Sequence, residues 1–270
     1  MPQLKRKEAP AGSPPRSASA ERGRQNQFDG LLQCARYAFM PNKLQFCGGN
    51  KNSALFEYCV NAVSEPPLET LLREFRTLHP YLRLIADANK ISDPFDHRVV
   101  EAYWIGNELL ENIRMNKFYW HLIDGLELKK KIKLSEFDKL ALKIPLGAKP
   151  HHSFHVFNVY LRTGHLPIEH TLETMNSCRI GWGRIKKILK NEIEIKTSDL
   201  IVRNNRLGLG EPAIKKIAYK FIDQCFLKNP KENDWVSYHW NWACEIINEQ
   251  QVSNLKKYSL QNMTIAAKRL

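Results

Sequence analysis

The side chains best suited to chemistry in this sequence are thiols and imidazoles, which are common ligands of transition metals. The chain has 270 residues, with six cysteines and nine histidines. The cysteines are Cys34, Cys47, Cys59, Cys178, Cys225 and Cys244. They form no Cys-x-x-Cys pair, which argues against a zinc ribbon or an iron-sulfur cluster and favours thiols over a disulfide framework. Any thiol chemistry is therefore expected to depend on a single cysteine.

Three histidines lie close together in the segment His151-His152-Ser153-Phe154-His155. On a helix, His151 and His155 occupy positions i and i+4 on one face, so both could bind one first-row metal ion. No HExxH glutamate lies between them, and a third ligand would have to come from elsewhere. The competing interpretation is a helix N-terminus with solvated histidines. We keep His151 and His155 as the hypothesis of a second metal site.

A further candidate is the loop that contains Cys47, Gly48 and Gly49, just before an expected helix start at Asn50 or Asn52. Backbone N–H groups at such a place could bind an anion, and the glycines would let a partner's backbone approach. A plain turn is the competing interpretation. The segment also lacks the length and the Lys-Ser/Thr ending of a phosphate-binding P-loop.

Cys178 begins a segment that leads into an expected strand, and His239 lies within another expected strand near the end of the chain. A thiolate is a soft metal ligand, and a neighbouring imidazole makes the thiol easier to deprotonate. We expect Arg179 and Arg184 to add to this effect. The competing interpretation is a small buried cysteine and a hydrogen-bonded strand histidine.

These two segments resemble the ends of the HypC/HupF family of nickel-iron hydrogenase maturation chaperones. The first reads Cys178-Arg179-Ile180-Gly181-Trp182-Gly183-Arg184-Ile185-Lys186-Lys187-Ile188, and the second Trp235-Val236-Ser237-Tyr238-His239-Trp240-Asn241-Trp242-Ala243. The family begins with Cys, four residues, Gly, a basic or polar residue and a β-branched strand, and its later strand holds a histidine before an aromatic-Ala step. The resemblance covers about residues 178–260 and implies a small HypC-like, OB-like β-barrel.

The resemblance also implies a function, that of a hydrogenase maturation or assembly factor without enzymatic turnover. Cys178 and His239 would carry an iron centre with cyanide and CO ligands, and the partners would be a hydrogenase large-subunit precursor and other maturation proteins (HypD-like). The whole chain also resembles an uncharacterised prokaryotic family whose genes tend to lie near hydrogenase genes. Two features depart from the HypC/HupF pattern. Cys178 is internal, whereas the family's cysteine becomes the mature N-terminus, and residues 198–212 look like an insertion.

The elements that must position these residues divide the chain into two domains. Residues 1–27 are rich in Pro, Ser, Gly and charge, and we expect a disordered basic arm. Between residues 28 and 177, apolar side chains recur every three or four residues between prolines, which predicts an all-helical domain. From residue 178 to 262 a period near two predicts a small β-barrel, completed by a helix at about 246–258 and followed by a tail at 263–270. The expected fold class is α+β.

The net charge of +13 is unevenly distributed, because residues 178–270 hold 17 Lys and Arg against nine Asp and Glu, a balance of +8. A basic small barrel with exposed aromatic rings could bind nucleic acid, which is the main alternative function, and a His-ligated metalloprotein is another. The aromatic residues gather at 235–242 around His239 instead of spreading over neighbouring strands, so nucleic-acid binding is disfavoured. No paired carboxylates or dinucleotide fingerprint supports a common enzyme class.

The sequence offers no sign of a membrane or export signal. No run of residues approaches the roughly 18 apolar positions of a membrane span, and the N-terminus lacks the apolar core of a secretory signal. We therefore expect a cytoplasmic protein that has no membrane partner.

Overall fold

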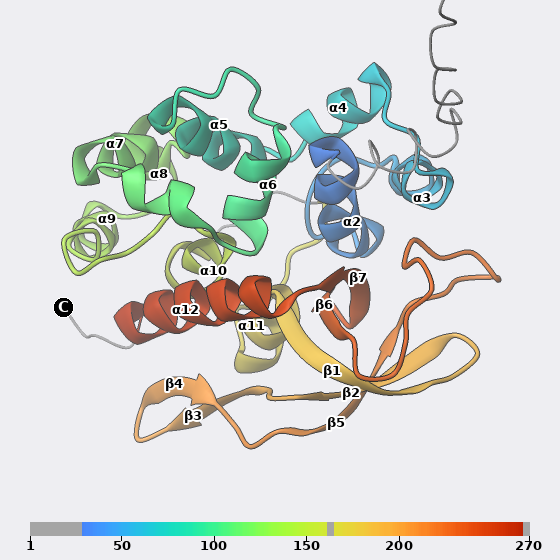
Figure 1. Cartoon of the computed structure of the whole chain (residues 1–270). Helices are drawn as coiled ribbons and strands as arrows, with labels where there is room; N and C mark the ends of the chain where they lie inside the picture. The colour runs from blue at the N-terminus through green and yellow to red at the C-terminus, as the bar shows by residue number, and fades with distance from the viewer. Residues whose placement is uncertain (1–28, 161–164, 267–270) are drawn as a thin grey trace, which may run out of the picture.

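The computed structural model describes residues 29–160 and 165–266, which form a helical region, a five-stranded sheet and a C-terminal helix (Figure 1). The α-helices are α2 (Gly30–Lys43), α3 (Asn52–Asn61), α4 (Pro66–Arg73), α5 (Leu78–Ala88), α6 (His97–Trp104), α7 (Met115–Trp120), α8 (Leu128–Lys131), α9 (Leu134–Ala141), α10 (His152–Phe154), α11 (Leu172–Cys178) and α12 (Glu249–Ala266). A 3-10 helix, η2 (Glu108–Asn112), and two π-helices, η3 (His121–Gly125) and η4 (His155–Val159), lie between them. The arm expected at residues 1–27 lies outside the described residues.

The helices follow the apolar periodicity of the sequence, and prolines lie at or near some of their ends. Asp29 caps α2 by accepting a hydrogen bond from the backbone N–H of Leu32. Pro66 occupies the first turn of α4, where a missing N–H costs nothing. Pro41 does not end α2, which continues through it to Lys43. None of the described helices has the length and apolar character that crossing a bilayer requires.

The strands are β1 (Gly181–Ile188), β2 (Glu192–Thr197), β3 (Leu200–Arg203), β4 (Arg206–Leu209), β5 (Ala213–Ala218), β6 (Trp235–His239) and β7 (Trp242–Ile247). Five of them pair in the order β1-β2-β5-β7-β6 and close into a barrel, with β6 returning to β1. All of these pairings are antiparallel except β5 with β7, which is a single parallel pair between Ala218 and Trp242. Strands β3 and β4 form a separate two-stranded sheet.

The C-terminal helix does not begin where the sequence suggested. The residues expected to start it, 246 and 247, belong to β7 and pair with β6, so α12 begins only at Glu249. The helix then runs to Ala266, so the first four residues of the expected tail, 263–266, are helical, and Met263 and Ile265 are buried. Residues 267–270 lie outside the described part of the chain.

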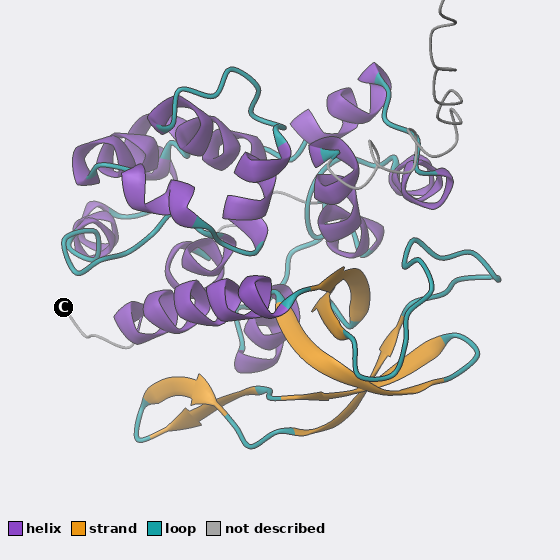
Figure 2. Cartoon of the chain, in the orientation of Figure 1, coloured by secondary structure: helices purple, strands orange, loops and turns teal. Residues whose placement is uncertain are grey.

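The helical region and the barrel share one hydrophobic core. Leu32 of α2, Trp242 of β7 and Leu255 of α12 all belong to this core. Figure 1 shows α12 in red between most of the helices and the β3–β4 hairpin, and Figure 2 shows most helices on one side of α12 and the strands on the other. α12 therefore packs against the helical region as well as against the strands. This packing brings residues of the helical region against one end of the barrel.

Gly106, just beyond the end of α6, makes close packing of α12 possible. Its φ is +95°, and a Cβ atom there would lie 2.1 Å from the ring of Tyr258. The Tyr258 hydroxyl donates a hydrogen bond of 2.9 Å to the carbonyl of Asn107. Only glycine allows both this backbone conformation and so close an approach of the Tyr258 ring. Gly106 therefore lets Tyr258 pack there and hold α12 against the helical region.

Candidate metal centre

Strand pairing brings Cys178 and His239 to the same end of the barrel. β1 and β6 are antiparallel, and their register pairs Gly181 with Tyr238. The start of β1 therefore lies beside the end of β6. Cys178 is the last residue of α11, three positions before Gly181, and His239 is the last residue of β6. The ring of Tyr238 fills the space over Gly181, where a Cβ atom would lie 2.1 Å from it.

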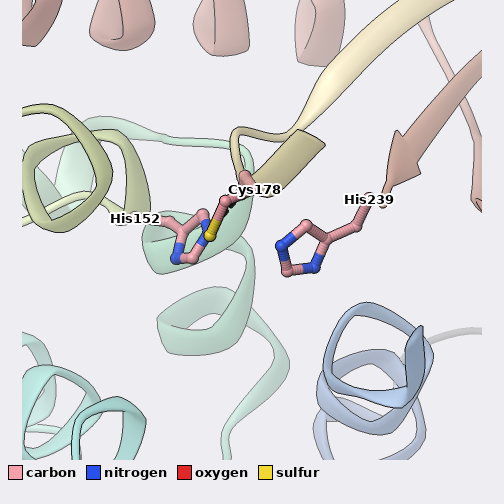
Figure 3. Close-up of side chains that lie close together, drawn as sticks. All are labelled: His152, Cys178 and His239. Atoms are coloured by element: carbon pink, nitrogen blue, oxygen red, sulfur yellow. Dashed lines mark hydrogen bonds between the residues drawn. The ribbon is translucent and has the colours of Figure 1, made fainter. Parts of the chain in front are cut away.

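A third donor, His152, comes from α10 in the helical region. One potential ligand atom from each of His152, Cys178 and His239 lies within 4.8 Å of the other two. Their side chains converge from α10, α11 and β6, with the His239 ring pointing toward the other two (Figure 3). All three residues are buried, with exposed fractions of 6%, 6% and 1%. One thiol and two imidazoles are a donor set that suits zinc, copper or iron.

The orientation of His239 is set by a proline in α2. In an α-helix the carbonyl of residue 37 accepts a hydrogen bond from the N–H of residue 41. Residue 41 is Pro41, which has no N–H, and the Tyr37 carbonyl instead accepts from His239 Nδ1 at 2.7 Å. Because a carbonyl can only accept, Nδ1 carries the proton and Nε2 carries the ring's lone pair. Metal-binding histidines are commonly oriented by such a contact to a backbone carbonyl.

His152 is held by hydrogen bonds at both ring nitrogens. Nε2 donates to the carbonyl of Cys178 at 2.9 Å, so Nδ1 accepts from the Tyr103 hydroxyl at 3.1 Å. Burial, with a smaller effect from His239, lowers the pKa of His152 well below its usual value, so the ring is neutral. For His152 to bind a metal ion, one of these two hydrogen bonds must break. That costs about 1 kcal/mol net, which is small beside a metal-ligand bond.

The cluster lies on the wall of a narrow cavity of about 50 Å³ between the helical region and the barrel. This volume accommodates a few water-sized groups. Besides the three donors, Cys47, His155, Tyr103 and Trp104 line it, together with the apolar residues Ala38, Leu78 and Val156. The Trp104 ring lies over the site, with its centroid 4.6 Å from that of His152 and 5.8 Å from that of His239. The cavity is thus a mostly apolar space with a compact set of metal ligands.

Comparison with protein families places almost the whole chain in one of them. Residues 26–270 match the family described as "Family of unknown function (DUF6390)". The chain belongs to this family. No curated protein and no solved structure matches the chain. Membership of the DUF6390 family assigns no activity.

The pair His151 and His155 does not have the helical arrangement expected for a second metal site. The helix begins one residue later than assumed, so that His151 is an extended N-cap residue whose Nδ1 accepts from the N–H of Ser153. His155 begins a π-helix, and its ring packs against that of Tyr81 with the centroids 5.9 Å apart. The residue between them, His152, is the one that joins Cys178. No spacing rule distinguishes His152, because the helix start decides which imidazole faces the barrel.

The two arginines expected to assist the thiol are engaged elsewhere. Arg179 is buried and donates hydrogen bonds to the side chain of Asn176 and the carbonyl of Ser198. Arg184 pairs with Glu249 at the start of α12. All six cysteines lie in the described part of the chain, and none of them forms a disulfide.

The loop site proposed from the sequence, at Cys47, Gly48 and Gly49, lies between α2 and α3. The helix that follows begins at Asn52, and Lys51 provides no side-chain cap. Gly48 has a φ of +78°, and a Cβ atom there would lie 2.6 Å from the Phe75 ring. Phe75 thus fills the space beside Gly48. The thiol of Cys47 instead contributes to the cavity wall.

Replacing Pro41 by alanine is expected to weaken metal binding without destabilising the fold. The substitution supplies an N–H that competes with His239 Nδ1 for the Tyr37 carbonyl, so His239 loses part of its orientation. We expect Co²⁺ affinity to fall about tenfold, which is at the lower end of the effect of losing a contact that orients a metal-binding histidine. We also expect an equal or higher melting temperature, because alanine is more favourable than proline inside a helix. Nitrogen-15 NMR of the metal-free protein measures the His239 tautomer directly.

The matched control is Pro66→Ala, because Pro66 is in the first turn of α4 and its missing N–H leaves no carbonyl without a donor. This variant should keep both the metal affinity and the His239 tautomer of the wild type. Unchanged affinity and tautomer in Pro41→Ala would show that the proline does not set the orientation of His239.

Proposed function

We propose that this protein is a metal carrier that acts in the maturation of nickel-iron hydrogenase. Its cargo is the iron centre with cyanide and CO ligands, held by Cys178 and His239 with help from His152. The protein delivers this centre to a hydrogenase large-subunit precursor, working with other maturation proteins (HypD-like) in the cytoplasm. It binds and transfers the centre and has no catalytic turnover of its own.

The observation that carries this proposal is the buried cluster of His152, Cys178 and His239. The cysteine and the histidine belong to the two segments that resemble the HypC/HupF family, and they are 61 positions apart in the sequence. Their donor atoms nevertheless lie within 4.8 Å of each other. A barrel with a cysteine just before its first strand and a histidine at the end of a later one supports a HypC-like, OB-like fold.

The surroundings of the cluster suit an iron centre that carries small diatomic ligands. Low-spin iron favours a soft thiolate, which Cys178 supplies, and the lone pair on His239 Nε2 supplies a second donor. The cyanide and CO ligands would occupy the space lined by Ala38, Leu78 and Val156. Burial protects such a centre from water and oxygen. The centre is then released only when a partner protein docks.

The burial of Tyr238 and Trp242 in the barrel favours a carrier over a nucleic-acid-binding protein. A stacking groove needs exposed rings. Tyr238 and Trp242 have exposed fractions of only 1% and 3%, and the ring of Trp235 is covered by the guanidinium of Arg184 at 4.6 Å. The positive charge of the barrel alone gives weak, sequence-independent attraction to polyanions.

The proposal is tested by purifying the full chain without oxygen from cells that are producing a nickel-iron hydrogenase. We expect about one iron per chain and infrared bands from cyanide and CO stretches, which fall where protein does not absorb. Metal analysis and infrared spectroscopy of the same sample provide both measurements. Iron without these bands would contradict the proposed cargo, and a chain that carries no metal and binds none in vitro would contradict the carrier function.

A further inference from the structure

We propose that this site also binds a divalent ion that carries no cyanide or CO, and that Cys47 then turns inward from the mouth of the cavity as a second thiolate ligand to complete a four-coordinate His₂Cys₂ site. The inference rests on the proposed function, since it presumes that the cluster binds metal. An iron centre with cyanide and CO fills its remaining positions with those ligands, so Cys47 binds only an ion that lacks them. The coordinating thiols release their protons to solvent when the ion binds. No redox step is involved.

The position of Cys47 relative to the three buried donors is the first reason. Its side chain lines the same 50 Å³ cavity as His152, Cys178 and His239. It is not one of the three residues whose donor atoms lie within 4.8 Å of one another, so it must move toward them to bind the same ion. Cys47 is partly exposed, whereas the other three donors are buried. It is therefore the donor that an arriving ion meets first.

The loop that presents Cys47 is fixed to the rest of the site on both sides of the cysteine. Asn42, only 3% exposed, donates hydrogen bonds from Nδ2 to the carbonyls of Cys47 at 2.9 Å and Gly49 at 2.7 Å. The ring of Phe46 packs on that of Trp240, the residue after His239, with the centroids 4.8 Å apart. Because these contacts hold the backbone in place, the approach of the thiol to the cluster that we propose is a rotation of the Cys47 side chain.

The chemistry of the donor set supplies the second reason. Three protein ligands leave one position open, and a structural tetrahedral site fills it with another protein side chain. His155, the first residue of the π-helix η4, also lines the cavity, but its ring is packed against that of Tyr81 in α5. A thiolate at the mouth can hold the ion while it exchanges its previous ligands, and then deliver it to the buried donors. Cys47 is the cavity-lining thiol placed to do this.

The test is a titration of the metal-free full chain with Co²⁺, because the sulfur-to-cobalt charge-transfer absorption grows with the number of thiolates bound. Wild type should show the intensity of two thiolates and the visible bands of a tetrahedral ion. Cys47→Ala should lose about half of the charge-transfer intensity and bind Co²⁺ at least about tenfold more weakly. Cys225→Ala is the matched control, since Cys225 is also partly exposed but lies outside this cavity, and it should match wild type.

The possible results separate the inference from the proposed function. A wild-type spectrum of one thiolate that is unchanged in Cys47→Ala overturns the role of Cys47 and leaves the carrier function intact. The absence of any charge-transfer absorption in wild type overturns both. A circular dichroism spectrum of Cys47→Ala identical to that of wild type shows that its loss of absorption is not a folding defect.

Discussion

Cys178→Ala is expected to abolish metal binding and hydrogenase maturation while leaving the protein folded. Cys178 supplies the sulfur among the three donors that lie within 4.8 Å of one another, so its loss leaves only two imidazoles in the buried cluster. The cost in the free energy of unfolding should be about 1 kcal/mol, because one small buried side chain is shortened. Hydrogenase activity in cells that carry the variant is the measurement, with the level of soluble protein as its reference.

Other substitutions define what this result means. His239→Ala should weaken the function without abolishing it, because the imidazole is one donor among several. Cys244→Ala and Cys225→Ala should behave like wild type, since neither thiol belongs to the cluster. Full hydrogenase activity in the Cys178→Ala strain would mean that the barrel acts as a docking module without the proposed chemistry.

The second large effect expected is a loss of stability in mild acid. Burial, with a smaller effect from His155, lowers the pKa of His121 to about 3, and burial lowers that of His151 to about 3 as well. The unfolded chain has its ordinary histidine pKa near 6.5. As the pH falls from 6.5 toward 3, the unfolded state therefore binds protons that the folded state does not. The stability contributed by the neutral rings is complete above about pH 6.5 and is lost progressively below it.

The size of this effect is comparable with the whole stability of the protein. Each group contributes a slope of about 1.4 kcal/mol per pH unit, so two units below pH 6.5 the pair removes roughly 5 kcal/mol. Urea unfolding followed by circular dichroism between pH 7 and pH 4.5 measures the slope. In His121→Gln one fewer group titrates, so the slope should fall by about 1.4 kcal/mol per pH unit, whatever the stability of the variant at neutral pH. An identical slope in both proteins would contradict the assignment of His121 as a buried neutral group.

Local patterns in the sequence predicted much of the secondary structure. The three- and four-residue spacing of apolar side chains indicated the helical region, and the period near two after residue 178 indicated strands, as in β2, where Ile193 and Ile195 are buried. Where local signals conflicted with tertiary pairing, the pairing prevailed. Residues 246–247 were assigned to the last helix, but they pair with β6, because hydrogen bonding to a neighbouring strand satisfies their backbone. The short strand β4 gives only a weak local signal, since RLGL carries two-residue alternation for only four positions.

The pairing of Cys178 with His239 was an expectation from the sequence, and the structure brings them together. Antiparallel pairing of β1 and β6 is the physical reason, because it sets the start of one strand beside the end of the other. The third member, His152, was not anticipated. A histidine spacing of i and i+4 selected its two neighbours, and that spacing applies only if the helix has already begun at His151.

The sequence by itself determined the types of residue available for chemistry and the elements that carry them: the thiol of Cys178, the imidazole of His239, and a helical region followed by strands. Only the tertiary structure decided which groups share a site. α12 packs against both regions, which brings α10 to the end of the barrel, and the missing N–H of Pro41 leaves the Tyr37 carbonyl available to orient His239. Such contacts join residues as far as 202 positions apart, and no local pattern of side chains encodes them.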